Sequence, residues 1–155
     1  MLDIIELPKI NKKIFFLFDM FGKIKVYDAK DNNLYLKVSN KKLLPKKKYQ
    51  INFMNGFNIL VDEKTFNQVK VNSTIIYDYS TKKILKIMDL KEKIFVYIYD
   101  GKYKGNIGEV VSFINYSGVT RDIVQINIGN IEQSTAKDYC YVVGTEKKDL
   151  ERFKN

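Results

Sequence analysis

Apolar segments of strand length recur along the whole chain, with turn-forming residues between them at close spacing, and this pattern constrains the fold more than any other feature. Strands are expected at 13–18, 23–27, 49–53, 57–61, 73–79, 84–88, 94–99, 109–115, 122–128 and 139–143. Short segments of this kind, separated by turn residues, are typical of small β barrels and sandwiches. The sequence therefore predicts a mainly β fold.

Two pairs of these segments are expected to form hairpins. In the first pair the connection is Asp19–Gly22, where the glycine supplies a positive φ. In the second pair the connection contains Asn55-Gly56, which is the strongest short-range signal for a type I′ turn. Both hairpins place strands that are adjacent in sequence side by side in a sheet.

Two segments depart from the strand pattern. Residues 31–44 have mixed apolar spacing, from which we expect one or two helical turns. Residues 145–153 follow Gly144 and begin with Thr145, a residue that favours the N-cap position, so a short C-terminal helix is expected there.

The composition argues against most catalytic chemistry. The 155 residues include no His, no Trp and one Cys, so His-ligated zinc, a Ser-His-Asp or Cys-His arrangement and an intramolecular disulfide are excluded. Cys140 lies in an apolar segment and is expected to be a small buried hydrophobic residue. No spacing of Asp and Glu fixes two carboxylates across a substrate. We therefore expect no enzyme, no cofactor and no metal site.

The charge indicates a polyanionic partner. There are 27 Lys plus Arg against 18 Asp plus Glu, a net charge of +9, and nucleic acid and an anionic membrane both fit it. No apolar run approaches the roughly 18 residues of a membrane span, and the acidic N-terminus is unlike a signal peptide. Arg121 and Arg152 are the only arginines. Lysine attracts phosphate as a point charge, so recognition of a backbone is favoured over reading of bases.

The densest run of positive charge surrounds Pro45. It consists of Lys41, Lys42, Lys46, Lys47 and Lys48. Five lysines around one loop would release several counterions on meeting RNA. The alternative is a solvated face, which is the commoner role of a charge run.

A loop between two apolar strands in residues 93–113 carries the second basic segment. In it the glycines and the polar residues are interleaved as Gly101, Lys102, Tyr103, Lys104, Gly105, Asn106 and Gly108. Glycine permits positive φ and the close approach of a backbone, which suits a clamp on phosphates. A strand-like run follows Gly108, unlike in a P-loop or a dinucleotide fingerprint. The alternative to RNA contact here is a solvated hairpin turn.

The glycine spacing resembles the KOW motif, a loop in small SH3-like barrels of ribosomal and transcription-elongation proteins. Over most of its length the chain also resembles the eukaryotic and archaeal ribosomal protein S4e family. The similar segments, in order, are Asp3–Lys9, Phe16–Val26, Lys70–Ile76, Thr81–Ile84, Phe113–Asn115, Gly118, Asp122–Ile126 and Tyr141–Gly144. Ordered agreement at several places is far more specific than one glycine loop.

The resemblance implies an S4e-like central domain in residues 1–88, a KOW SH3-like barrel in 89–145 and a short basic helical tail in 146–155. It implies a structural component of the small ribosomal subunit in the cytoplasm. Its partners would be small-subunit rRNA and neighbouring ribosomal proteins, with no membrane and no small-molecule substrate. The rRNA would be contacted by stacking of Tyr103 and by the basic residues, including Arg121. The alternative is a KOW-type RNA- or protein-binding module outside the ribosome, such as a transcription-elongation factor.

The chain also departs from the family pattern. Members of the family normally begin with an S4-type RNA-binding domain, which is not expected in this sequence, so RNA contacts made by that domain are not expected either. The family is expected to have an arginine in the last barrel hairpin, and this sequence has Ala136-Lys137 near that place instead.

Overall fold

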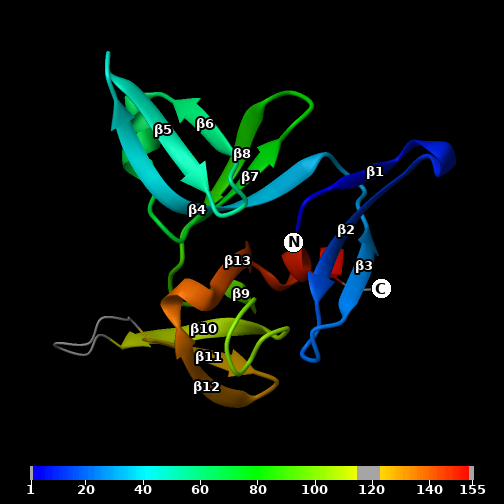
Figure 1. Ribbon diagram of the computed structural model, residues 1–155. Helices are drawn as coiled ribbons and strands as arrows, with labels where there is room; N and C mark the ends of the chain where they lie inside the picture. Colours follow the sequence, from blue (N-terminus) through cyan, green and yellow to red (C-terminus); the bar gives the residue numbers. More distant parts are fainter. Residues whose placement is uncertain (1, 115–122, 154–155) are drawn as a thin grey trace.

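The computed structural model describes residues 2–114 and 123–153, and within them the chain forms three antiparallel sheets (Figure 1). The mainly β fold is confirmed. The first sheet has the order β1-β2-β3, with β1 at Ile5–Leu7, β2 at Lys12–Phe18 and β3 at Ile24–Asp28. A single 3-10 turn, η1 at Pro8–Ile10, connects β1 to β2.

The second sheet has the order β6-β5-β4-β7-β8. Its strands are β4 (Asn33–Leu44), β5 (Lys48–Phe53), β6 (Asn58–Val61), β7 (Thr74–Asp78) and β8 (Lys83–Met88). A short helix, α1 at Glu63–Gln68, connects β6 to β7, and the carboxylate of Asp62 caps it by accepting from the Thr65 N–H at 2.8 Å.

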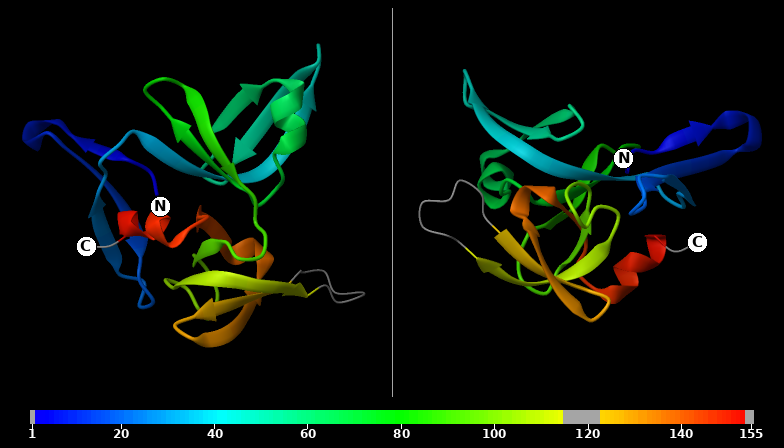
Figure 2. Two further views of the ribbon diagram at one scale, coloured as in Figure 1. Left: turned by 180° about the vertical axis from the view of Figure 1, so that it is seen from behind. Right: turned by 60° about the horizontal axis from the view of Figure 1, so that its bottom comes forward.

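The third sheet has the order β12-β11-β10-β9-β13. Its strands are β9 (Phe95–Ile98), β10 (Ile107–Ile114), β11 (Ile123–Ile128), β12 (Ile131–Ala136) and β13 (Cys140–Gly144). The 3-10 turn η2 (Lys137–Tyr139) precedes β13, and η3 (Lys147–Phe153) follows it and lies beside the first sheet (Figure 2).

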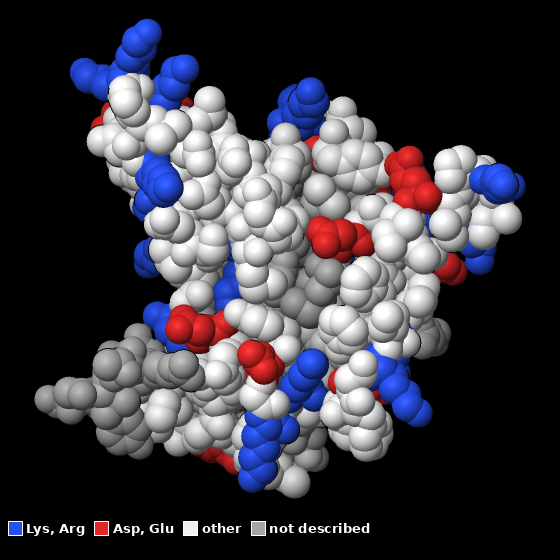
Figure 3. Space-filling view, in the orientation of Figure 1, with Lys and Arg blue, Asp and Glu red and all other residues white. Residues whose placement is uncertain are grey.

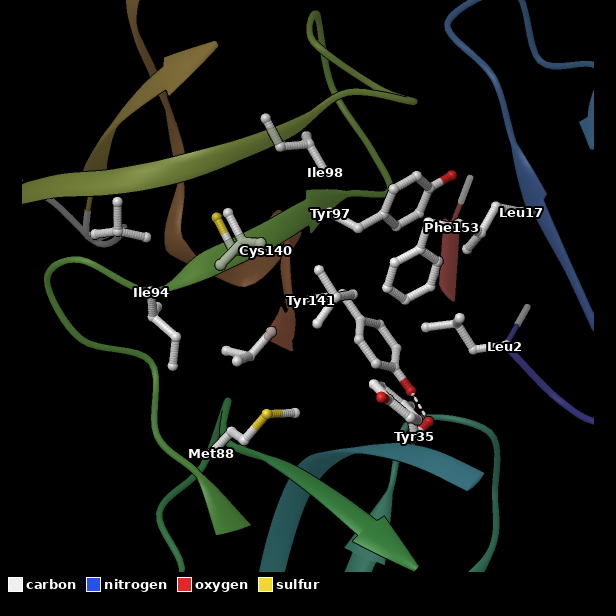
Figure 4. Close-up of a cluster of buried hydrophobic side chains, with 14 of the residues drawn as sticks. Leu2, Leu17, Tyr35, Met88, Ile94, Tyr97, Ile98, Cys140, Tyr141 and Phe153 are labelled. Carbon is white, nitrogen blue, oxygen red and sulfur yellow. Dashed lines mark hydrogen bonds between the residues drawn. The ribbon is translucent and has the colours of Figure 1, made fainter. Parts of the chain in front are cut away.

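The largest hydrophobic core joins the first and third sheets. Phe15 and Leu17 of β2 are buried with Val96, Tyr97 and Val142 of the third sheet, and Figure 4 shows Tyr35 of β4 reaching the same cluster. A second core lies under the β4–β8 sheet. Its buried members are Leu36, Val38, Ile51, Phe53, Val69, Ile75 and Tyr77. The division of the chain at residue 88 stays a prediction.

The expected helical turns in 31–44 are wrong, because this segment is the long strand β4. Residues 35–38 are all buried, since Tyr35 enters the first core while Leu36 and Val38 enter the second. Burial on both faces removes the period-two alternation by which a half-buried strand is recognised.

Both expected hairpins are present, but the Asn55-Gly56 connection is not a type I′ turn. Gly56 has a φ of +87°, whereas Asn55 is not among the residues with positive φ. The N–H of Gly56 donates to the Phe53 carbonyl at 3.0 Å, and the N–H of Phe53 donates to Phe57 at 2.8 Å. The glycine therefore closes the turn as a bulge residue, the arrangement common in longer hairpin loops.

The expected C-terminal helix is the 3-10 helix η3. The carboxylate of Asp149 accepts from the N–H groups of Thr145 and Glu146 at 2.9 and 3.1 Å, and from the Thr145 hydroxyl at 3.2 Å. Asp149 thus accepts from the free N–H groups at the start of this helix, whereas we expected Thr145 to cap it.

Candidate nucleic-acid interface

The basic segment around Pro45 forms the free end of the β4–β5 hairpin, which we call the hairpin tip and define as residues 42–48. Leu44 pairs with Lys48, so residues 45–47 make the connection. Lys42, Lys46, Lys47 and Lys48 are all exposed. Figure 3 shows basic side chains gathered at this end of the molecule, and in residues 42–48 all of them are lysines. Within the described residues, none of these four lysines forms an ion pair with a carboxylate.

Lys41 differs from the other lysines of the run because its ammonium is bound internally. It donates to the carbonyls of Phe66 and Val69, at 2.7 and 2.8 Å, and lies 4.5 Å from the centroid of the Phe66 ring. These carbonyls belong to the C-terminal end of α1, where cations and donors are favourable. The structure brings Lys42, Lys46, Lys47 and Lys48 together and separates Lys41 from them.

The glycines of the second basic segment serve close approaches within the protein. Gly105 has a φ of +91°, and a Cβ added to it would lie 2.2 Å from the backbone nitrogen of Met20 in the β2–β3 turn. A Cβ on Gly108 would lie 2.4 Å from Ile126 of β11. Gly101 has a φ of +84°, and a Cβ added to it would lie 3.0 Å from the ring of Tyr139. A backbone does approach closely at Gly105, but it is the chain's own, and the clamp on RNA phosphates stays a prediction.

The polar residues of this loop are divided between internal contacts and solvent. The Tyr103 hydroxyl donates to Gln133 at 2.5 Å, and its ring packs against the first core. The Asn106 side chain donates to the Tyr103 carbonyl at 2.8 Å. Lys104 is half-buried, with its ammonium 5.3 Å from the Phe18 ring centroid, while Lys102 is exposed. Lys102 is thus the more exposed of the two lysines, although its ammonium also lies 5.6 Å from the Tyr103 ring centroid. Arg121 lies outside the described residues.

Sequence reasoning missed a buried lysine between the second and third sheets. Within the described residues, Lys37 of β4 is the one charged residue that is buried, at 4% exposed. Its ammonium donates to the carbonyls of Asp138 and Cys140 at 2.8 and 2.7 Å. It also donates to the Tyr99 hydroxyl at 3.2 Å. Burial lowers the pKa of Lys37 to about 8. The only sequence signal was a lysine inside the apolar run 34–38.

Cys140 is buried beside this lysine, as expected of a small hydrophobic residue. Burial raises the pKa of the Cys140 thiol to about 12, so the reactive thiolate is disfavoured at neutral pH. Within residues 2–114 and 123–153, no three His, Cys, Asp or Glu side chains gather in a way that could hold a metal ion. In the same ranges, no helix has the length and apolar character needed to cross a membrane.

Comparison with known proteins agrees with this architecture. Residues 11–84 match the model of the ribosomal family S4e. The chain is 28% identical to the small ribosomal subunit protein eS4 of Archaeoglobus fulgidus, in an alignment covering 95% of this chain and 61% of that protein. It is 29% identical to the eS4 protein of Methanocaldococcus jannaschii, covering 95% and 63%.

A solved structure shows the same fold. The crystal structure of the 30S ribosomal protein S4e from Thermoplasma acidophilum superposes with a TM-score of 0.74, covering 95% of this chain and 73% of that one at 19% identity. The matches together define a β-rich ribosomal-protein fold. Residues 11–84 match the ribosomal S4e family, and the similarity to small ribosomal subunit eS4 proteins extends over 95% of the chain. The chain spans about three fifths of the length of the curated relatives that it matches.

Proposed function

We propose that this chain is a non-catalytic structural component of the small ribosomal subunit that binds rRNA through lysine–phosphate contacts. The observation that carries the proposal is the similarity to eS4 proteins over 95% of the chain. The unpaired lysines of the hairpin tip and the exposed Lys102 support it, because an exposed ammonium without a carboxylate partner retains its full attraction for phosphate. Its partners would be small-subunit rRNA and neighbouring ribosomal proteins.

Two basic regions support this role, and their side chains differ in how far they are exposed. At the hairpin tip, four lysines are exposed. In the glycine loop, Lys102 is exposed, whereas Lys104 lies over Phe18 and Tyr103 is hydrogen-bonded to Gln133. We therefore assign phosphate contact to the four lysines of the hairpin tip and to Lys102. Contact by Lys104 would require its ammonium to leave the Phe18 ring. Stacking by Tyr103 would require its ring to leave the core contact that it makes here.

Sedimentation distinguishes a ribosomal role from an extra-ribosomal binding module. A tagged chain should co-sediment with small subunits and remain bound in high salt. A chain recovered only in the ribosome-free fractions would contradict the proposal and favour an RNA- or protein-binding module outside the ribosome.

The salt dependence of rRNA binding tests the glycine loop. Replacing both lysines in Lys102→Gln/Lys104→Gln should reduce the slope of log affinity against log salt concentration by about 1–2 units. The matched control is Lys82→Gln/Lys83→Gln, which removes the same charge from the β7–β8 turn. If the two variants change the slope equally, the loop makes no contact of its own.

A further inference from the structure

The hairpin tip contains two consecutive lysines in the left-handed backbone region. Lys46 has a φ of +64° and Lys47 a φ of +54°. Consecutive positive φ values in a hairpin connection are usually supplied by Asn and Gly, because a Cβ is unfavourable in this conformation. Lysine is therefore a poor choice for the fold at both positions, and a residue that costs stability at an exposed site is a candidate for function.

Other lysines with positive φ lie in a different electrostatic setting. Lys82 and Lys93 have φ values of +57° and +63°, each as a single residue. Asp78 precedes Lys82 in the same turn, and Glu92 directly precedes Lys93. In contrast, residues 42–48 contain no carboxylate. The hairpin tip is thus the place where backbone strain and uncompensated charge coincide.

Apart from the exposed Leu43, the tip offers a partner mainly positive charge. Residues 42–48 contain no aromatic, arginine, amide or hydroxyl side chain, so the groups that stack on bases or read base edges are missing from it. Single-stranded RNA is recognised mainly through such stacking and edge contacts. A cluster of lysine ammonium groups suits phosphates that are already close together.

Contacts with α1 anchor the hairpin that carries these lysines. On the face toward α1, Lys41 is bound to the carbonyls of Phe66 and Val69, and the ring of Tyr49 lies 5.1 Å from that of Phe66. Lys42 and Lys48 pair with Gln50 and Leu44, which places them on the opposite face of the ribbon. Lys46 and Lys47 lie in the connection itself, so all four lysines belong to the end of a two-stranded ribbon.

Resting on the proposed function, we infer that the hairpin tip binds double-stranded RNA by contacting phosphates of both strands across the major groove. In A-form RNA this groove is deep and narrow, so the two phosphate backbones approach each other. The major groove of B-form DNA is about 12 Å wide, which spreads the two rows of phosphates apart. The geometry of four lysines on one narrow end matches the A-form arrangement.

The test measures binding of the full chain to a 20-base-pair RNA duplex, to one of its strands alone and to the DNA duplex of the same sequence. The wild-type chain should prefer the RNA duplex. The variant Lys46→Gly/Lys47→Gly should lower the RNA-duplex affinity roughly tenfold and the salt slope by about 2 units. The same variant should raise the melting temperature by several degrees, because glycine relieves the left-handed strain.

Lys82→Gly is the matched control, since it relieves the same kind of strain and removes one charge elsewhere. It should raise the melting temperature while leaving duplex affinity within about twofold. Equal losses of affinity in the control and the tip variant would overturn the inference, as would equal binding of the single strand or the DNA duplex. Failure of the wild-type chain to bind any RNA would instead contradict the proposed function.

Discussion

Gly105 lies so close to Met20 that a Cβ at the glycine would be 2.2 Å from the backbone nitrogen of Met20. The contact joins the glycine loop to the β2–β3 turn, and the Tyr97 hydroxyl reinforces it by accepting from the Phe18 N–H and donating to the Phe18 carbonyl. The glycine loop is therefore part of the scaffold that positions the first sheet.

Gly105→Ala should destabilise the protein by about 3 kcal/mol, because it combines an unfavourable positive φ with a clash against backbone atoms that cannot rotate away. Gly22→Ala is the control, since Gly22 has a φ of +76° but no atom within 4 Å of an added Cβ. It should cost about 1 kcal/mol. Urea unfolding measures both, and similar costs would show that the Gly105 contact yields without penalty.

Lys41 and Lys42 should have opposite roles although they are adjacent. Lys41→Met removes two hydrogen bonds to carbonyls of α1 and should cost about 2 kcal/mol of stability, with little change in the salt dependence of RNA binding. Lys42→Met should leave stability within about 0.5 kcal/mol and lower the salt slope by about 1 unit. Exchanged effects would refute the assignment of Lys41 to the fold.

The buried Lys37 predicts a rise in stability between pH 8 and 9. Its pKa is lowered from 10.5 to about 8 in the folded protein, so in this range the unfolded chain binds more protons than the folded one. The free energy of unfolding then increases with pH, by at most about 1.4 kcal/mol per pH unit. Well below pH 8 Lys37 contributes no slope, since it is protonated in both states.

Lys37→Met supplies the comparison for the pH measurement. The variant should lack the rise, and subtracting its unfolding free energies from those of the wild type isolates Lys37 from Cys140 and Tyr99, whose pKa values are raised to about 12. Those two groups act in the opposite direction, because the folded state then holds the proton more tightly above pH 9 to 10. Parallel wild-type and variant profiles would rule out a lowered pKa for Lys37.

Arg152 should not be replaceable by lysine. Its guanidinium lies 4.7 Å from the Phe15 ring centroid and 4.5 Å from that of Tyr35, forms a 3.1 Å ion pair with Asp31 and donates to the Asn33 carbonyl. A lysine ammonium cannot keep the planar stacking and both hydrogen-bonding directions at once. Arg152→Lys should cost about 1–2 kcal/mol. Thermal unfolding monitored by circular dichroism would measure the loss.

Strands in which apolar and polar residues alternate, or that flank a turn containing glycine, could be predicted from the sequence, as at β2, β3 and β5. The strand β4 could not, because its central residues are buried on both faces and serve two cores. The only sequence feature that indicates the helix α1 is Asp62 at its N-cap, and a single capping residue before so short a helix is easily overlooked. Its six residues are too few to show a helical period.

The candidate interface was predictable in its chemistry and less so in its details. Lysine density alone located the hairpin tip. It could not separate Lys41 from Lys42, because the acceptors of Lys41 are carbonyls about 25 residues away in α1. Likewise, the glycine pattern indicates that a backbone approaches Gly105, but the pattern is equally satisfied by a foreign chain or by the protein's own turn.

The bend in β4 sets how far the hairpin tip reaches. β4 pairs with β7 over residues 33–37 and with β5 beyond, and its register against β5 shifts between Val38 and Asn40. The extra residue is Ser39, and a bulge of this kind kinks a strand and redirects whatever lies beyond it. Adding or deleting one residue at Ser39 would therefore turn the part of β4 beyond it onto the opposite face, which would redirect Lys42 and take Lys41 away from α1, while the β4–β7 pairing before it is kept.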